Sequence, residues 1–219
     1  MLFEGLEKRE SIVQSKGYLI TLEGIDGCGK TTQAERLCAV LKDRGLTSHL
    51  FREPGGTVIG EKIRSILLDP SLTEMNPLTE LFLYLAARVQ ITDELIRPSL
   101  ENGDIVVMDR YSDSTIAYQG YARGIGSDTV SSANTIATMG LIPDVTFIID
   151  CDPGLAMSRT SSEPDRLEAE GQAFMERVRE GFLQLAKLDP ERYVIIDGSK
   201  PIDGVEADIK REMKRLFDF

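Results

Sequence analysis

The feature that most constrains the fold is a glycine-rich segment between a short apolar run and a helical pattern. Residues 24–32 read GIDGCGKTT and contain the pattern G-x-x-x-x-G-K-[ST]. The preceding residues 18–23 are mostly apolar, and the residues that follow, up to Arg44, place apolar side chains at helical spacing. A strand, a glycine-rich turn and a helix in this order let backbone N–H groups wrap around phosphate. The sequence therefore predicts a phosphate-binding loop at residues 24–32.

Further strands and helices alternate along the chain. We expect strands at 18–23, 47–51, 105–108, 145–149 and 193–196, and helices at 30–44, 57–68, 78–97 and 202–216. Helix 78–97 carries Leu78, Phe82, Leu85 and Val89 on one stripe, and Pro98 is expected to kink or end it. Continuous apolar strands between helices are typical of parallel strands covered on both faces. The pattern predicts an α/β fold with a mostly parallel, five-stranded sheet.

Composition excludes several classes of protein. The chain has 219 residues, and 25 Lys+Arg against 36 Asp+Glu give a net charge of −11. That charge disfavours a protein that coats nucleic acid, whose surface is usually basic, but it does not exclude small anionic ligands, which respond to local charge. A hydrophobic content of 42% argues against disorder, and no run of 18 apolar residues is present to span a membrane.

Two segments stand apart from the regular pattern. Residues 1–16 mix charged and apolar side chains without the apolar core of a signal peptide. We treat them as an N-terminal extension of unknown role before one domain at 17–219, and we expect a cytoplasmic location. The three cysteines show no CxxC spacing, so no zinc site or disulfide framework is indicated. Residues 160–171 are polar and contain Pro164, which predicts a loop or a mobile flap.

The phosphate-binding loop indicates a nucleoside triphosphate but leaves the reaction open. Lys30 is expected to reach the outer phosphates, and the Thr31 hydroxyl can bind Mg²⁺. GTPases, motor ATPases and small-molecule kinases share such a loop. No NKxD motif, which reads the guanine base in GTPases, is present. The residues that select the reaction must therefore lie elsewhere in the chain.

Charged side chains near two strand ends indicate a second, anionic substrate. Asp26 lies inside the phosphate-binding loop, where a carboxylate is unfavourable unless it faces a sugar hydroxyl or Mg²⁺. Asp109 and Arg110 follow the apolar strand 105–108, and ligands of open α/β sheets bind at the carboxyl ends of strands. Arg110 could therefore bind an anion, and Asp109 could hold Mg²⁺ through water. Guanidinium groups bind phosphate with two parallel hydrogen bonds.

Several motifs together resemble the thymidylate kinases of the bacterial type. They are GIDGCGKTTQ, REPGG at 52–56, GEKIR at 60–64, AAR at 86–88, DRYSDSTIAYQGYARGIG at 109–126, LIPDVTFIID at 141–150 and DRLE at 165–168. The match runs in order from about Lys16 to the C-terminus. The resemblance implies a three-layer P-loop kinase fold with a five-stranded parallel sheet and a mobile lid. It also implies a homodimer and the reaction ATP + dTMP → ADP + dTDP with Mg²⁺.

The resemblance also implies the site residues. ATP would be bound by the loop residues Gly24, Ile25, Asp26, Gly27, Cys28, Gly29, Lys30, Thr31 and Thr32, and Mg²⁺ by Thr31 and Asp109. dTMP would be bound by Asp26, Glu53, Arg64, Tyr84, Arg88, Arg110, Thr115 and Gln119. Lys30, Arg110, Arg159 and Arg166 would be catalytic, the last two from a lid at 159–171.

The dTMP residues would each have a part in acceptor binding. Asp26 would contact the deoxyribose 3′-hydroxyl, Arg110 the phosphate, and Glu53 would help to order the acceptor or its waters. Arg64 and Arg88 would lie near the acceptor phosphate and thymine O4, and Thr115 and Gln119 at the edge of the thymine ring. Tyr84 takes the position where the family usually has the phenylalanine that stacks on thymine.

Two points of this interpretation stay open. The resemblance implies catalytic arginines from the lid, or in another type of the family from the phosphate-binding loop. Here the loop holds Gly27 and Cys28 at its variable positions, so the resemblance leaves Arg159 and Arg166 of the lid as the candidates. The motifs also leave two other functions: a different P-loop kinase for another nucleotide or small molecule, or a nucleotide-binding regulator without catalysis. Lys30, Thr31 and Arg110 are all present, which argues against the regulator.

Overall fold

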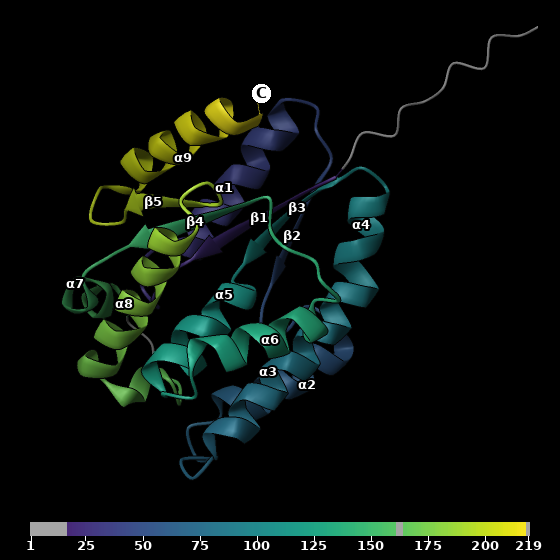
Figure 1. Cartoon of the computed structure of the whole chain (residues 1–219). Coiled ribbons are helices and arrows are strands. Elements are labelled where there is room, and N and C mark those ends of the chain that lie inside the picture. Colours follow the sequence, from purple (N-terminus) through teal and green to yellow (C-terminus); the bar gives the residue numbers. More distant parts are fainter. Residues whose placement is uncertain (1–16, 161–163, 218–219) are drawn as a thin grey trace, which may run out of the picture.

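The computed structural model describes residues 17–160 and 164–217. These residues contain one parallel sheet with the strand order β2-β3-β1-β4-β5 (Figure 1). The strands are β1 (Tyr18–Glu23), β2 (Ser48–Arg52), β3 (Ile105–Asp109), β4 (Val145–Asp150) and β5 (Tyr193–Asp197). The predicted five-stranded parallel sheet is confirmed. The predicted extension at 1–16 and part of the predicted lid, 161–163, lie outside the described residues.

Helices cover both faces of the sheet. They are α1 (Lys30–Asp43), α2 (Val58–Leu68), α3 (Pro77–Ile91), α4 (Arg97–Glu101), α5 (Ser112–Thr115), α6 (Ser127–Ala137), α7 (Pro153–Arg159), α8 (Gln172–Leu188) and α9 (Ile202–Phe217). Two π-helical segments, Thr92–Ile96 and Ile116–Ala122, and a 3₁₀ turn, Glu168–Glu170, join some of them. Figure 1 shows α1 and α9 on one side of the sheet, with α3 to α6 on the other.

Both faces of the central strands are buried. The side chains of a strand alternate between its two faces, and helices cover each face. On β3, Val107 packs in the cluster that contains Leu37 of α1, whereas Val106 packs in the cluster that contains Ile96. Both valines are fully buried. The continuous apolar runs in the sequence thus correspond to strands sandwiched between helices, as predicted.

The long helix predicted for 78–97 extends further than expected. Helix α3 continues through the π-helical turn Thr92–Ile96 into α4, so the chain stays helical up to Glu101. Pro98 does not end it, because it lies in the first turn of α4, where its missing N–H is tolerated. The predicted stripe also differs from a core face, since Phe82 is 64% exposed.

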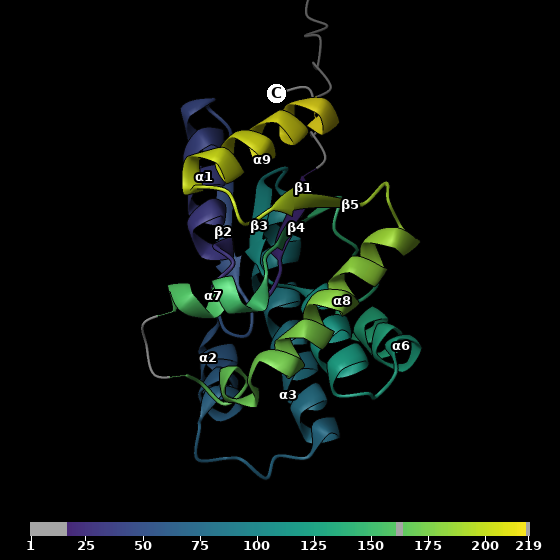
Figure 2. The ribbon, with the colours of Figure 1, turned by 90° about the vertical axis from the view of Figure 1, so that its left-hand side faces the viewer.

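The part of the predicted flap that the structure describes is packed against the rest of the protein and is not a solvated loop. Within predicted flap 160–171, Leu167 belongs to the main hydrophobic core and Arg166 is buried. Figure 2 shows the chain after Pro164 lying beside α2, where the Arg166 N–H bonds to the Leu68 carbonyl.

In the part of the chain described, no helix has the length and apolar character needed to cross a bilayer.

The carboxyl ends of three neighbouring strands meet at one edge of the sheet. Asp109 at the end of β3 pairs in register with Leu22 of β1 and with Arg52 of β2. The phosphate-binding loop follows β1, and Arg110 follows β3 directly. The sheet therefore brings the phosphate-binding loop, the motif that starts at Arg52 and the motif that starts at Asp109 together at a single edge, as expected for an open α/β sheet.

Candidate active site

The phosphate-binding loop has the predicted strand–turn–helix context, and its glycines are required by close packing. It links Glu23, the last residue of β1, to Lys30, the first residue of α1. Gly24 has φ +140° and Gly27 φ +79°, which side chains rarely tolerate. A Cβ atom at Gly27 would lie 2.2 Å from the Ala156 carbonyl oxygen. The glycines thus let the loop pack against α7 while leaving its backbone free to face a ligand.

A large open cavity lies over this loop, with about 1590 Å³ of space. Of the nine loop residues predicted to bind ATP, seven line it: Asp26, Gly27, Cys28, Gly29, Lys30, Thr31 and Thr32. Gly24 and Ile25 do not line it, but their carbonyl oxygens accept hydrogen bonds from Arg110 Nη1 and Lys30 Nζ, at 2.7 and 2.8 Å. Those two residues position charged side chains at the edge of the cavity.

Thr31 and Asp109, the predicted Mg²⁺ residues, are in direct contact. The Thr31 hydroxyl donates to Asp109 Oδ2 at 2.5 Å. Both groups offer the hard oxygen atoms that Mg²⁺ prefers, and this ion usually takes only one or two protein carboxylates, with water and phosphate completing its shell. The pair fits a magnesium ion carried in by a nucleotide.

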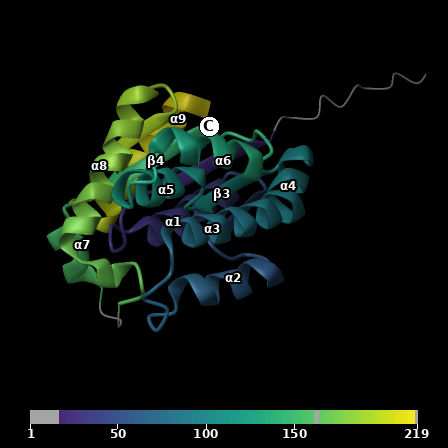
Figure 3. The same ribbon diagram turned by 60° about the horizontal axis from the view of Figure 1, so that its bottom comes forward.

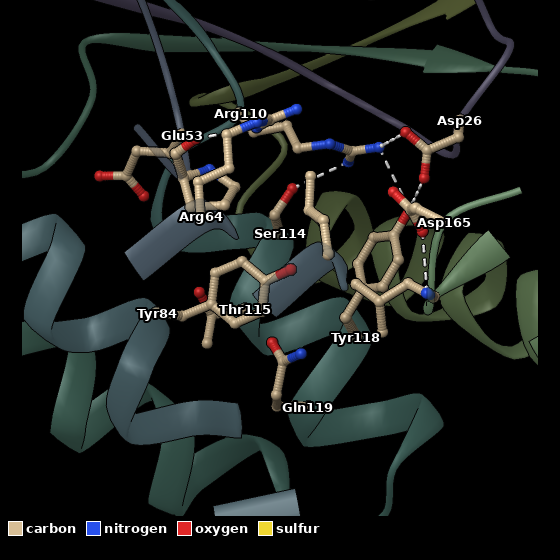
Figure 4. Close-up of a pocket in the computed structure, with 13 residues that line it drawn as sticks. Asp26, Glu53, Arg64, Tyr84, Arg110, Ser114, Thr115, Tyr118, Gln119 and Asp165 are labelled. Carbon is tan, nitrogen blue, oxygen red and sulfur yellow. Dashed lines mark hydrogen bonds and ion pairs between the residues drawn. The ribbon is translucent and has the colours of Figure 1, made fainter. Parts of the chain in front are cut away.

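A second, smaller pocket adjoins the first and encloses about 440 Å³ of space that is continuous with solvent (Figure 4). It is lined by Asp26, Glu53, Pro54, Arg64, Leu68, Tyr84, Arg110, Ser114, Thr115, Tyr118, Gln119, Asp165 and Leu167. All predicted dTMP residues except Arg88 are in this set. Asp26, Glu53, Arg64 and Arg110 also line the cavity over the loop, so these four side chains form the shared wall of the two sites.

Arg110 and Asp26 form an ion pair in this shared wall. Arg110 Nη2 lies 2.5 Å from Asp26 Oδ1, and the Tyr118 hydroxyl donates to Asp26 Oδ2 at 3.1 Å. Burial acts to raise the pKa of Asp26, but Arg110 and Lys30 outweigh it and hold that pKa well below its ordinary value. Asp26 therefore stays ionised and can accept a hydrogen bond from a hydroxyl group.

Arg110 has an unusual backbone conformation that Glu23 supports. Its φ angle is +69°, a region that non-glycine residues seldom adopt. The buried carboxylate of Glu23 accepts from the N–H groups of Tyr111 at 2.7 Å and of Ser114 at 3.3 Å, and from the Ser114 hydroxyl. These bonds hold the chain just after Arg110, so its guanidinium points back across the pocket toward Asp26.

Arg88 lies behind the pocket and does not line it. It is 1% exposed, and its guanidinium donates to Glu53 Oε2, Thr115 Oγ1, Asn134 Oδ1 and the Tyr111 carbonyl oxygen. Burial raises the pKa of Glu53 despite this partner. The predicted contact of Arg88 with the acceptor stays a prediction, and the geometry favours support of Glu53 and Thr115. Glu53 Oε1, by contrast, is buried without a hydrogen-bond partner in the described chain.

The end of the pocket away from the charged wall is lined by an aromatic ring, a hydroxyl group and a side-chain amide. In Figure 4, Arg110 and Asp26 lie at one end and Gln119 at the other, with Tyr84 and Thr115 between them. Burial raises the pKa of Tyr84, which therefore keeps its proton. A planar side chain beside a side-chain amide can stack on a base and bond to its edge.

The two lid arginines lie in different places. Arg159, at the end of α7, lines the cavity over the phosphate-binding loop and donates to the Gly198 carbonyl at 2.9 Å. Arg166 is not among the residues that line that cavity, and its Nη1 lies 2.6 Å from Oε2 of buried Glu80. A catalytic role for Arg166 stays a prediction, which this geometry does not favour, because a fixed counterion holds the guanidinium elsewhere.

The sequence interpretation missed four residues that shape the site. Ser114 and Tyr118 line the acceptor pocket, Glu23 holds the Arg110 turn, and Glu80 holds Gln119 and Arg166. Ser114 and Tyr118 lie within the motif at 109–126. Tyr118 follows Thr115 by three residues and Ser114 by four, a helical spacing that could have indicated both residues. Glu23 and Glu80 act through partners far apart in sequence, so no local pattern marks them.

The fold and the two adjoining pockets define the class of protein. A parallel sheet with a phosphate-binding loop after its central strand, and a smaller pocket that shares a wall with the cavity over this loop, is the architecture of a P-loop nucleotide kinase. A family model described as Thymidylate kinase matches residues 22–209. The chain belongs to the thymidylate kinase family, which confirms the predicted family and the prediction of a dTMP kinase, a phosphotransferase.

Individual relatives agree with this assignment. A protein named thymidylate kinase from Thermoanaerobacter sp. (strain X514) is 48% identical over 203 residues, covering 92% of this chain and all of that protein. One from Thermosipho africanus (strain TCF52B) is 51% identical over 192 residues, covering 87% of this chain and 94% of that protein. The crystal structure of thymidylate kinase from Ehrlichia chaffeensis superimposes with a TM-score of 0.76 at 33% identity, covering 90% of this chain and 98% of that one.

Proposed function

We propose that this protein transfers the γ-phosphoryl group of ATP to dTMP, with Mg²⁺, and releases ADP and dTDP. The observation that carries the proposal is the shared wall of Asp26, Glu53, Arg64 and Arg110 between the cavity over the phosphate-binding loop and the smaller pocket. Two ligands bound on either side of this wall would have their reacting phosphates next to each other. Such positioning is the main requirement of phosphoryl transfer.

In this proposal the protein supplies charge and position, without a general base. The dTMP phosphate oxygen that attacks is already anionic at neutral pH. Arg110 would bind that phosphate, and Lys30 would bind the outer phosphates of ATP. Arg159 lies at the same cavity and would offset charge that develops on the transferred group. Magnesium, when bound with ATP, would supply further positive charge, held by Thr31 and Asp109.

The other end of the pocket would select the acceptor. Asp26 is ionised and would accept a hydrogen bond from a deoxyribose hydroxyl. Tyr84 would stack on the thymine ring, and Gln119 and Thr115 would lie at its edge (Figure 4). Because Tyr84 makes no hydrogen bond through its hydroxyl within residues 17–160 and 164–217, the ring is the part of this side chain that the site would use.

An assay of ADP release tests the proposal against the other P-loop functions. Purified protein with ATP and Mg²⁺ is given dTMP, dUMP, CMP or AMP, and ADP is measured spectrophotometrically. We expect turnover that depends on dTMP and is much lower with CMP and AMP. Faster turnover with another acceptor would identify a different kinase, whereas tight ATP binding without any acceptor-dependent turnover would identify a regulator.

We also propose that the protein forms a homodimer through helices α2, α3 and α6. These helices are neighbours (Figure 3), and they carry exposed apolar side chains: Val58, Ile59, Ile66, Leu78, Phe82, Val89 and Ile136. Large exposed apolar patches usually mark contact surfaces. Sedimentation tests this: we expect the wild-type protein to be a dimer and Phe82→Glu to be a monomer.

We also propose that the protein is located in the cytoplasm, and cell fractionation would test this.

A further inference from the structure

Glu80 of helix α3 is completely buried although it carries a carboxylate. Its Oε1 accepts from Gln119 Nε2 at 2.8 Å, and its Oε2 lies 2.6 Å from Arg166 Nη1. Arg123 donates to both oxygens, from Nε at 3.3 Å and from Nη2 at 3.2 Å. One carboxylate thus joins α3, the π-helical segment after α5 and the predicted lid.

These partners keep the Glu80 carboxylate ionised inside the protein. A buried carboxylate is strongly unfavourable unless cations and hydrogen-bond donors surround it. Burial acts to raise the pKa of Glu80, but the hydrogen bonds from Gln119, Arg123 and Arg166 outweigh it and lower that pKa. An ionised carboxylate only accepts hydrogen bonds. Whatever faces Glu80 must therefore donate.

That requirement fixes the orientation of the Gln119 amide. A glutamine side chain has a donor, Nε2, and an acceptor, Oε1, at the same end. With Nε2 bonded to Glu80, a flip would place the two oxygens against each other and lose a charge-assisted hydrogen bond. Oε1 makes no hydrogen bond within residues 17–160 and 164–217, and Gln119 lines the acceptor pocket. One of the two Nε2 hydrogens is taken by Glu80, and Oε1 is the atom that the side chain can present as an acceptor to a bound base.

A fixed acceptor distinguishes pyrimidine bases by their hydrogen-bonding edges. Thymine and uracil carry a hydrogen on N3, which can donate to Oε1. Cytosine has a lone pair at N3, which Oε1 would repel. A site built to bond one edge rejects the other strongly, because its buried polar group is left unpaired.

We propose that Glu80 is a positioning residue for base recognition: it holds the Gln119 amide with Oε1 toward the N3–H of the acceptor base, and through Arg166 it couples this orientation to the packing of residues 164–171 against the end of α2. The inference rests on the proposed function, since it concerns the acceptor pocket of that reaction. It assigns to Glu80 no contact with substrate.

The coupling to the lid follows from how Arg166 is held. Its Nε donates to the Leu67 carbonyl at 2.8 Å and its backbone N–H to the Leu68 carbonyl at 3.5 Å, both at the end of α2. The third partner of Arg166 is Glu80, through the ion pair at 2.6 Å. Without Arg166, the buried carboxylate would lose one of its two cations, and protonation of Glu80 would free Gln119 to turn.

The test compares dTMP with 5-methyl-dCMP, which differs from it only at the N3 and C4 edge of the base. We would measure kcat and KM for both acceptors by ADP release, in wild type, Glu80→Gln and Arg166→Gln. A neutral glutamine at position 80 can accept or donate, so the Gln119 amide would adopt both orientations. We expect the ratio of kcat/KM values, dTMP over 5-methyl-dCMP, to fall by roughly tenfold or more in Glu80→Gln. Arg166→Gln should lower it in the same direction.

Two further variants separate positioning from simple structural support. Glu170→Gln removes another carboxylate bonded to Arg123 and should leave the ratio unchanged. In a Gln119→Leu background, Glu80→Gln should change the ratio no further. An unchanged ratio in both Glu80→Gln and Arg166→Gln, with only a lower Tm or equal losses for both acceptors, would overturn the inference. If Glu80→Gln fails to fold, Arg166→Gln alone decides. Absence of dTMP-dependent ADP release in wild type would instead overturn the proposed function.

Discussion

Arg110 and Asp26 come from different strand ends and meet as an ion pair across the wall between the two pockets. Arg110 Nη2 lies 2.5 Å from Asp26 Oδ1, and Arg110 Nη1 is bonded to the Gly24 carbonyl oxygen at 2.7 Å. The pair therefore ties the phosphate-binding loop to the turn after β3. It also places one positive and one negative group where an acceptor nucleotide would present its phosphate and its sugar hydroxyl.

Replacing Arg110 should weaken both acceptor binding and turnover. In Arg110→Ala, the acceptor phosphate loses charge-assisted hydrogen bonds, and Asp26 is left without its main counterion. We expect dTMP affinity and kcat each to fall, with kcat/KM lower by about 100-fold or more. Calorimetry with dTMP and the ADP assay measure the two effects. Arg215→Ala, an exposed arginine of α9, is the control and should change neither. Unchanged dTMP affinity in Arg110→Ala would contradict the role given to it.

Tyr84 should contribute its ring and not its hydroxyl. Tyr84→Phe keeps the aromatic surface of the pocket, so kcat and the KM for dTMP should stay close to wild type. Tyr84→Ala removes the stacking surface, and the KM for dTMP should rise roughly tenfold, the scale of base–aromatic stacking. Steady-state kinetics of the three proteins measure this. If Tyr84→Ala also leaves KM unchanged, the side chain supports the pocket wall without touching the base.

Arg159 and Arg166 should affect different steps, because only Arg159 lines the cavity over the phosphate-binding loop. Arg159→Ala should lower kcat by roughly 10³-fold, the scale of an arginine that stabilises a transferring phosphoryl group, with little change in the KM for dTMP. Arg166→Ala should instead lower Tm and acceptor selectivity, since it leaves Glu80 underpaired. A loss of kcat below tenfold in Arg159→Ala, together with a loss of 10³-fold in Arg166→Ala, would return the catalytic role to Arg166.

Local patterns in the sequence predicted the parts of the site that depend on short stretches of chain. The strand–turn–helix context of the phosphate-binding loop and the position of Arg110 directly after a strand both follow from a motif next to a strand end, and the structure has this arrangement. Parallel strands align their carboxyl ends, so residues far apart in sequence meet there without further information. For the same reason the fold class could be predicted from alternating apolar strands and helices.

Other parts depended on which charges pair in the interior, which no local pattern shows. Residues 160–171 are polar enough to suggest a solvated loop, yet Arg166 is buried because Glu80, 86 positions earlier, compensates its charge. Arg88 matches a motif, but Glu53 and Thr115 take its donors. The packing of α3 against the segments that carry Glu53 and Arg166 decided these pairings. On the apolar stripe of α3, Phe82 is exposed whereas Leu85 is buried, a difference that the spacing of apolar residues in the sequence does not show.

The Glu23 carboxyl should make the free energy of unfolding of the protein depend on pH. Burial, and to a lesser extent the nearby Asp113 carboxyl, raises the pKa of Glu23 from 4.5 to about 7. In an unfolded chain the pKa would remain near 4.5, so between these two values the folded state holds a proton that the unfolded state lacks. The stability linked to this proton is fully present below pH 4.5 and is lost as the pH rises to about 7.

Glu23→Gln should therefore remove this pH dependence. Glutamine keeps the shape of the side chain and an oxygen to accept from the Tyr111 N–H, but it does not titrate. Relative to the variant, the free energy of unfolding of the wild type should fall by on the order of 2 kcal/mol between pH 5 and pH 7. Urea unfolding at a series of pH values measures this difference, with the exposed Glu176→Gln as control. Parallel curves for wild type and Glu23→Gln would show that the Glu23 carboxyl does not hold the extra proton in the folded protein.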